Sequence, residues 1–98
     1  MYATINISSP ITSAFLEQNK PNPFTHNTTI GYRLPKNFTN AQIKITDING
    51  KTLKAINISG SGKGALSVEA SILSSGAYNY SLYVNGNLVS TKQMERLK

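Results

Sequence analysis

Residue types that support acid–base or nucleophilic catalysis are sparse in this chain. It contains one histidine, His26, no cysteine, and four carboxylates that fall in different segments. A catalytic centre needs an acid, a base or a nucleophile to converge on one point. No spacing in the sequence brings two such groups together. We therefore expect a protein that is not an enzyme and that uses no metal ion and no cofactor.

Two short stretches superficially fit ligand-binding loops. The run Asp47-Ile48-Asn49-Gly50 starts like a calcium loop, but the remaining ligand positions and the closing glutamate are missing. Residues 60–64 are rich in glycine, but they lack the Gly-Lys-Ser/Thr ending of a phosphate loop and no helical pattern follows them. We predict a hairpin turn for the first stretch and a flexible connection for the second.

The charge of the chain limits the class of partner. Ten basic and four acidic residues give a formal net charge of +6 at pH 7, which suits an anionic partner. Nucleic-acid binding usually needs basic groups gathered on one face. Most basic residues here stand singly, and only three approach a cluster: Lys92, Arg96 and Lys98. We therefore expect no nucleic-acid partner.

Alternation of apolar and polar residues dominates the chain after about residue 14. Short alternating runs are separated by turn residues, and the clearest are residues 28–34 and 41–47. The side chains predicted to face the core in the first and the later runs are Ile30, Tyr32, Leu34, Leu66, Val68, Ala70, Tyr78, Tyr80, Leu82 and Val84. The pattern predicts one small all-β domain, an immunoglobulin-like antiparallel β-sandwich of about seven strands.

Asn49-Gly50 predicts the turn of one hairpin, because both positions of a tight two-residue turn need positive φ. Counting outward from that turn pairs Ile43 with Ile56, Ala41 with Ile58 and Ile45 with Lys54. A bulged three-residue loop would instead pair Ile45 with Leu53. The sequence predicts the hairpin and leaves both registers open.

A second Asn-Gly pair, Asn85-Gly86, predicts the turn of the last hairpin, which returns along residues 88–92. The preceding spacing Leu73-x-x-Gly76-x-Tyr78 resembles the tyrosine corner of immunoglobulin-like sandwiches. In that motif a tyrosine near the start of a strand bonds to upstream backbone through its hydroxyl. We therefore interpret Tyr78 as structural before any role in recognition.

The run Pro21-Asn22-Pro23-Phe24 forms a stiff elbow, because each proline fixes its own φ and pushes the preceding residue into extended geometry. Phe24 is thus delivered rigidly. We expect a clamp that buries Phe24 in the core and protects an edge strand. The alternative is a preorganised docking surface.

Two longer segments carry a family resemblance. Residues 16–24 and residues 73–82, in this order and followed by a short basic tail, resemble the C-terminal sorting domains of the type IX secretion system of Bacteroidetes, also called the Por secretion system. The resemblance covers Ala14 to Lys98. Residues 1–13, rich in Ser, Thr and Asn, are then expected to be a linker or the trailing segment of a missing passenger.

The resemblance implies a cargo tag that directs a passenger across the outer membrane. Such a tag is recognised by the translocon and its shuttle components at the periplasmic side, and a sortase-like surface protease then removes it. The passenger is afterwards joined to anionic lipopolysaccharide, at the cell surface, or released. We expect the tag to be a monomer. The cleavage site should lie in or before residues 1–13, where an unpaired chain can enter a protease cleft.

By the same resemblance, the signal concentrates in the last strands. In Thr91-Lys92-Gln93-Met94, Gln93 stands where a second basic residue is typical. The residues expected to be read by the translocon are Gly76, Tyr78, Asn85, Gly86, Lys92, Gln93, Met94, Arg96 and Lys98. We expect the hairpin of residues 77–94 to present them, with strand addition at its free edge. Deleting residues 92–98 should then block export while affecting folding only weakly.

The start of the chain does not read as an export signal, because residues 1–8 lack a basic beginning and an unbroken apolar core. We expect a signal peptide far upstream in the precursor, with Met1 as the start of a fragment. No stretch of the sequence is long and apolar enough to span a bilayer.

Two other functions fit a small β-sandwich. One is a fibronectin-like module that binds carbohydrate or protein for a secreted enzyme or adhesin. Such modules usually display an exposed aromatic platform, whereas Tyr32, Tyr78 and Tyr80 alternate as core residues and only Tyr83 points outward in the pattern. The other is a chaperone-like domain that assembles a surface fibre, which would require oligomers.

Overall fold

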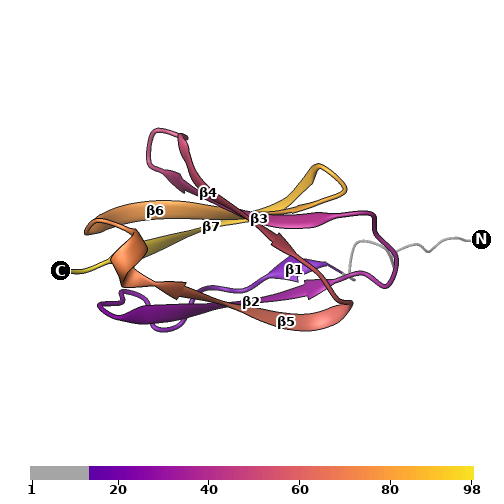
Figure 1. Cartoon of the computed structure of the whole chain (residues 1–98), viewed down its shortest axis with the longest axis horizontal. Coiled ribbons are helices and arrows are strands. Elements are labelled where there is room, and N and C mark those ends of the chain that lie inside the picture. The colour runs from indigo at the N-terminus through magenta and orange to yellow at the C-terminus, as the bar shows by residue number, and fades with distance from the viewer. Residues whose placement is uncertain (1–13) are drawn as a thin grey trace, which may run out of the picture.

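The structure of the chain is a computed structural model that describes residues 14–98. Residues 1–13, predicted to be a linker, lie outside the described residues. Figure 1 shows two layers of strands joined by short connections. The strands are β1 (Phe15–Leu16), β2 (Asn27–Leu34), β3 (Ala41–Asp47), β4 (Thr52–Ile58), β5 (Gly62–Glu69), β6 (Gly76–Val84) and β7 (Asn87–Arg96). One 3₁₀ turn, η2 (Ala70–Ile72), lies between β5 and β6.

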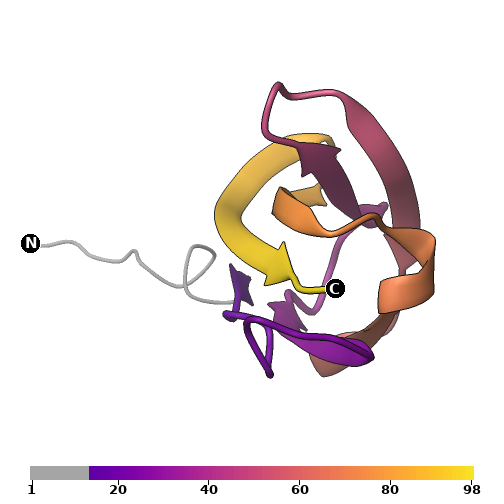
Figure 2. The same ribbon diagram turned by 90° about the vertical axis from the view of Figure 1, so that its left-hand side faces the viewer.

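The strands form a three-stranded sheet in the order β1-β2-β5 and a four-stranded sheet in the order β4-β3-β6-β7. Neighbouring strands within both sheets are antiparallel. Viewed from the end, the two sheets curve around a common interior (Figure 2). The predicted class, an immunoglobulin-like antiparallel β-sandwich of about seven strands, is confirmed.

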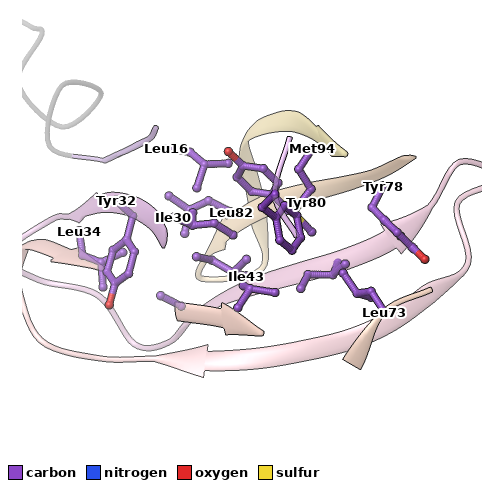
Figure 3. Close-up of a cluster of buried hydrophobic side chains, with 14 of the residues drawn as sticks. Leu16, Ile30, Tyr32, Leu34, Ile43, Leu73, Tyr78, Tyr80, Leu82 and Met94 are labelled. Carbon is purple, nitrogen blue, oxygen red and sulfur yellow. The ribbon is translucent and has the colours of Figure 1, made fainter. Parts of the chain in front are cut away.

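The core lies between the sheets and follows the predicted alternation. Ile30 of β2, Ile43 of β3, and Tyr80 and Leu82 of β6 are all 0% exposed. Figure 3 shows these side chains meeting in one cluster, with Met94 of β7 beside Tyr80. Their burial removes most of their apolar surface from water, which stabilises the fold by about 1.5–3 kcal/mol for each large side chain.

The turn at Asn49-Gly50 differs from the prediction. Only Gly50 has a positive φ, 91°. The Asp47 backbone N–H donates to the Lys51 carbonyl at 3.0 Å, so the loop holds three residues instead of two. The Asp47 Oδ1 atom accepts from the N–H groups of Asn49 and Lys51, each at 2.9 Å. These two hydrogen bonds favour the longer loop, because the carboxylate accepts from backbone N–H groups that a tight two-residue turn would pair with backbone carbonyls.

Beyond the loop, the hairpin has the register of the two-residue alternative. A bulge between Ile45 and Thr46 absorbs the extra loop residue. The pairs are Ala41 with Ile58, Ile43 with Ile56 and Ile45 with Lys54, as the two-residue count predicts. The hairpin itself is confirmed. Its pairing is that of the two-residue alternative and its loop has the three residues of the other alternative, whereas the expected positive φ at Asn49 is wrong.

The glycine-rich residues 60–64 are only partly a connection, because β5 already begins at Gly62. Gly64 pairs with Tyr32, and a Cβ atom at Gly64 would lie 2.5 Å from the tyrosine ring. Glycine is therefore required here by close packing of the ring. At the other end of β5, Ala70 is buried as predicted but belongs to the 3₁₀ turn η2.

The tyrosine corner is present. The Tyr78 hydroxyl donates to the Ser74 carbonyl at 2.7 Å, and the Tyr78 side chain is 8% exposed. Tyr78 thus ties the start of β6 to the connection that precedes it, which confirms the structural interpretation of this residue.

In residues 14–98 there is no helix with the length and apolar character needed to cross a membrane.

Candidate functional site

The terminal hairpin of β6 and β7 holds most of the residues predicted to be recognised. Asn85 and Gly86 have φ values of 53° and 79°, and Val84 pairs with Asn87 across them. The predicted two-residue turn is confirmed. β7 is the last strand of its sheet, so its outer edge faces no other strand of that sheet.

Asn85 also anchors this turn to the rest of the domain. Its Oδ1 atom accepts from the backbone N–H groups of Thr39 at 2.6 Å and Asn40 at 3.2 Å. Its own N–H donates to the Asn40 carbonyl at 2.8 Å. The tip of the hairpin is therefore held against the β2–β3 connection, and its position relative to the sandwich is set by three hydrogen bonds.

The elbow formed by Pro21, Asn22, Pro23 and Phe24 covers the C-terminal half of the β7 edge. The Phe24 N–H donates to the Glu95 carbonyl at 3.0 Å, and the Leu97 N–H donates to the Phe24 carbonyl at 2.8 Å. The Asn22 Oδ1 atom accepts from the Glu95 N–H at 2.9 Å. Both prolines follow cis peptide bonds. This half of the edge is thus paired by the chain itself.

Phe24 is 1% exposed and belongs to the core cluster. The elbow therefore acts as the predicted clamp: it buries its aromatic side chain and protects an edge strand. The docking alternative for Phe24 is wrong, because a partner cannot reach a side chain buried to this extent in the folded domain.

A buried polar network holds the segment between β1 and the elbow. Asn19 is 1% exposed, and its Nδ2 atom donates to Thr28 Oγ1 at 2.9 Å and to the Pro21 carbonyl at 3.1 Å. Thr28 Oγ1 donates to the same carbonyl at 2.8 Å. Gln18 Nε2 reaches across to the Gln93 carbonyl on β7 at 2.7 Å. The elbow is thus fixed to β2 and β7 by hydrogen bonds in addition to Phe24.

Tyr80 connects this network to the core. Its hydroxyl donates to the Glu17 carbonyl at 2.7 Å and accepts from the Asn19 N–H at 2.7 Å. Burial raises the pKa of Tyr80 to about 12, and the hydrogen bond from Asn19 opposes that rise. Figure 3 shows the ring of Tyr80 between Leu16 and Met94. The hydroxyl therefore links β6 to the segment that leads into the elbow.

The N-terminal half of the β7 edge is open. Backbone groups of Glu95 point to the elbow, and the Gln93 carbonyl points to Gln18. Alternate residues of a strand direct their backbone groups to the same edge, so Thr91 directs its N–H and C=O outward as well. Within residues 14–98, no strand pairs with this part of the edge. Like the outer edges of β4 and β5, it is an unpaired edge of the described chain that can accept a partner strand.

Exposed apolar side chains border the open half. Leu88 is 58% exposed, Val89 is 37% exposed, and Phe15 of β1 is 39% exposed. β1 contacts β7 along this side of the sandwich. Within the described residues, this half-edge is thus unpaired, and its strand carries the exposed Leu88 and Val89, a combination that favours strand addition.

The predicted recognition residues fall into exposed and enclosed groups. Gly76, Asn85, Gly86, Gln93 and Lys98 are exposed, and Lys92 and Arg96 are half-buried. Tyr78 and Met94 are buried at 8% and 1% exposure. In the folded domain the last two shape the hairpin from inside, while the others reach its surface.

The last residues of β7 also contribute to folding. Met94 belongs to the core, and Arg96 Nε donates to the Ala70 carbonyl at 3.0 Å. The elbow bonds to Glu95 and Leu97 as well. The expectation that deleting residues 92–98 affects folding only weakly is wrong, because the deletion removes a buried side chain and the partners of Phe24.

His26 lies on the surface and shares a 3.0 Å contact between its Nδ1 atom and Thr25 Oγ1. It borders an open hollow of about 320 Å³ with Glu69 and Arg96. One histidine and one exposed carboxylate do not form the convergent set that catalysis needs. Within residues 14–98, no three His, Asp or Glu side chains gather as metal ligands.

The tyrosines have the predicted distribution. Tyr32, Tyr78 and Tyr80 are buried at 9%, 8% and 0% exposure. Tyr83 points to the outer face of the four-stranded sheet and is half-buried, with Lys44 Nζ 4.7 Å from its ring centroid. This side chain alone does not form the aromatic platform of a carbohydrate-binding module.

Sequence reasoning missed the network of Gln18, Asn19 and Thr28. These polar residues lie beside the elbow in the sequence, but no periodicity marks them as buried. The two-residue strand β1 was missed as well, because it is too short to show alternation. The nearby prolines were the only local signal that this segment is ordered.

Within residues 14–98, the last strand of the sandwich thus has one covered and one unpaired half-edge. A protein-family model described as a secretion system C-terminal sorting domain matches residues 21–95. That range begins in the elbow and ends next to the last residue of β7. No curated protein and no solved structure matches the chain significantly.

Proposed function

The chain belongs to the family of secretion system C-terminal sorting domains, and we propose that the open half of its β7 edge is the surface that the type IX machinery reads. A C-terminal sorting domain of this system implies interaction with the secretion machinery and export of its protein to the cell surface or the medium. The passenger, the individual partners and the cleavage step belong to the proposal.

The observation that carries the proposal is the divided edge of β7. Its C-terminal half is closed by Phe24 and Asn22, and in its N-terminal half no backbone group of residues 14–98 pairs with the outward-facing groups of Thr91. A machine that exports unrelated passengers needs a feature that does not depend on their sequence. An exposed strand edge meets that need, because main-chain hydrogen bonds give affinity and neighbouring side chains give specificity.

Surface residues along the terminal hairpin and its tail would supply specificity. Asn85 and Gly86 fix the hairpin tip, and Gln93 and Lys98 expose polar and charged groups beyond it. Half-buried Lys92 and Arg96 place further positive charge on the same strand. Tyr78 and Met94 would act indirectly, by holding the shape of the hairpin.

The later fate of the tag is also part of this proposal. We expect passage through the periplasm, handover by a shuttle component to the translocon, and removal by a sortase-like surface protease. The cut would lie in or before residues 1–13, which precede the first packed residues of the sandwich. The passenger would then be attached to anionic lipopolysaccharide or released.

The experiment that tests this function is a fusion of a signal peptide, a fluorescent reporter and residues 1–98. It is expressed in a host that has the type IX system and in an otherwise identical strain without the translocon. We expect the reporter at the cell surface or in the medium of the first strain and in the periplasm of the second. Periplasmic retention in both strains would contradict export by this tag.

The matched control keeps the fusion and removes only the sandwich. The reporter with the signal peptide and residues 1–13 should stay in the periplasm of both strains. Export of this control would show that the lead segment carries the signal, which would also contradict the proposal.

A further inference from the structure

Two Asn-Gly pairs lie in the two hairpin turns of the four-stranded sheet. Asn49-Gly50 is in the turn after β3, and Asn85-Gly86 is in the turn after β6. Because β3 and β6 are antiparallel neighbours, the two turns lie at opposite ends of the sheet (Figure 1). Each pair follows a β-branched residue, Ile48 or Val84, and both asparagines are exposed. The sheet thus carries the same dipeptide in two different surroundings.

An asparagine followed by glycine can lose its side-chain amide without an enzyme. The glycine backbone nitrogen attacks the asparagine Cγ atom, because glycine has no side chain that hinders the approach. A bond from that nitrogen to Cγ forms, the bond from Cγ to Nδ2 breaks, and the amide leaves as ammonia with the proton of the glycine N–H. Water then opens the cyclic imide at either carbonyl and gives aspartate or isoaspartate. The side chain must first turn toward the glycine nitrogen, so hydrogen bonds that hold it slow the reaction.

The side chain of Asn85 is held in this way. Its Oδ1 atom accepts from the N–H groups of Thr39 at 2.6 Å and Asn40 at 3.2 Å, and its own N–H donates to the Asn40 carbonyl at 2.8 Å. Two donors on Oδ1 also polarise the amide carbonyl, which would assist attack. This assistance is lost when the side chain turns toward Gly86, because the turn breaks both bonds. The anchor therefore protects Asn85.

The side chain of Asn49 has no such anchor. Its backbone N–H donates to Asp47 Oδ1 at 2.9 Å, and the Gly50 N–H donates to the Asp47 carbonyl at 3.0 Å. Among the hydrogen bonds of residues 14–98, none involves the Asn49 side-chain amide. The amide can turn toward Gly50 while the hairpin remains paired, and only the bond from the Gly50 N–H has to open.

The position of this turn in the fold also favours opening. It leads into β4, which is an edge strand of its sheet, and Ile48 in the turn is 66% exposed. Loops with few buried contacts open more readily than the packed strands of a domain. The turn that contains Asn85 is instead bound to the β2–β3 connection.

We propose that Asn49 is a site of spontaneous deamidation in the folded protein and that Asn85 is protected from the same reaction by its anchor. Isoaspartate at position 49 adds a methylene group to the backbone of the loop, together with a negative charge. Asp47 Oδ1 accepts from the N–H groups of residue 49 and Lys51. The longer backbone displaces these donors and the new carboxylate repels that of Asp47, so both bonds weaken.

Peptide mapping of the purified full chain, incubated folded in weakly alkaline buffer, measures the two rates. Trypsin releases residues 45–51, in which Asn49 is the single asparagine, and residues 64–92, in which fragmentation locates Asn85. The mass change from amide to acid reports the reaction in each peptide. We expect Asn49 to lose its amide at least about tenfold faster than Asn85. Equal rates, or a faster loss at Asn85, would overturn the proposal.

The same chain in concentrated urea is the reference, because unfolding removes the anchor of Asn85. The two rates should then agree within about twofold. A tenfold difference that persists in urea would show that the flanking residues set the rates and would contradict protection by the fold. The matched control variant is Asn49→Gln, whose longer side chain closes the ring far more slowly. It should leave the peptide of residues 45–51 unmodified and the rate at Asn85 unchanged, whereas an altered rate at Asn85 would contradict independent control of the two turns.

Hydrogen exchange tests the effect of the product on the loop. In the fraction that contains isoaspartate, the Lys51 amide should exchange at least about threefold faster, because it loses its bond to Asp47. The Ile43 amide should not change. Unchanged exchange at Lys51 would contradict the weakening of the loop. All of these measurements use the isolated protein, so none of their outcomes bears on export of the reporter fusion.

Discussion

The two halves of the β7 edge present the same backbone groups in opposite situations. In the C-terminal half, Phe24 and Asn22 pair with Glu95 and Leu97. In the N-terminal half, the backbone of Thr91 faces outward beside exposed Leu88 and Val89. Edge strands invite association with other chains unless they are covered. Within residues 14–98, the domain thus closes this edge where the fold needs it and leaves the other half unpaired.

The covered half also contributes more to stability. Phe24 and Met94 are each 1% exposed, whereas the side chains around the open half are exposed or half-buried. Substitutions at the covered half should therefore destabilise the domain, so that a loss of recognition in these variants would reflect unfolding. Substitutions at the open half should alter recognition in a domain that is still folded. The predictions below separate these two effects.

The largest effect is expected at the clamp. Phe24→Ala removes a buried aromatic ring and should lower the free energy of unfolding by about 3–5 kcal/mol. Val89→Ala, at the open half, should lower it by less than about 1 kcal/mol, because Val89 is partly exposed. Urea unfolding followed by circular dichroism compares the two. Similar losses in both variants would contradict the division of the edge.

A smaller effect is expected at Tyr80. Tyr80→Phe leaves the Asn19 N–H and the Glu17 carbonyl without their partner, so it should cost about 1–3 kcal/mol. Because the pKa of Tyr80 is raised from 10.0 to about 12, the folded state favours the neutral phenol. This contribution is fully present below pH 10 and is lost as pH rises through 12.

Unfolding measured between pH 8 and pH 12 should therefore show a fall in stability in the unsubstituted chain. That part of the fall should be absent from Tyr80→Phe. Parallel pH profiles for the two proteins would show that the Tyr80 hydroxyl does not couple the elbow to the core in this way.

How far the sequence predicts a feature of this structure depends on whether the residues that determine it lie close together in the chain. The alternation of Ile30, Tyr32 and Leu34 was sufficient to predict the sandwich, because a strand with one buried face carries an apolar residue at every second position. Asn85-Gly86 predicted its turn for a similar reason: both residues adopt positive φ. Asn49-Gly50 did not predict its turn correctly, because the Asp47 carboxylate accepts hydrogen bonds from the backbone N–H groups of a longer loop. Residue types alone do not distinguish this loop from a two-residue turn.

The candidate site was predicted only in outline. The terminal hairpin and the buried clamp at Phe24 follow from motifs within single segments. The division of the β7 edge does not, because it arises from contacts between Gln18 and Gln93, and between Phe24 and Glu95, that are remote in the sequence. Burial of Met94 was missed because the basic residues around it indicate an exposed tail.

The smallest effect on stability and the most direct test of the account come from Thr91. Thr91→Pro removes an N–H that faces outward and leaves the ladder to β6 intact, so it should cost little stability at this edge position. Thr91→Ala keeps the N–H, and both variants lose the 2.8 Å contact between the Thr91 and Ser81 hydroxyls. The measurement is export of the reporter fusion carrying each variant. The account predicts normal export for Thr91→Ala and periplasmic retention of a folded Thr91→Pro fusion, whereas equal export of the two would contradict reading of the open edge.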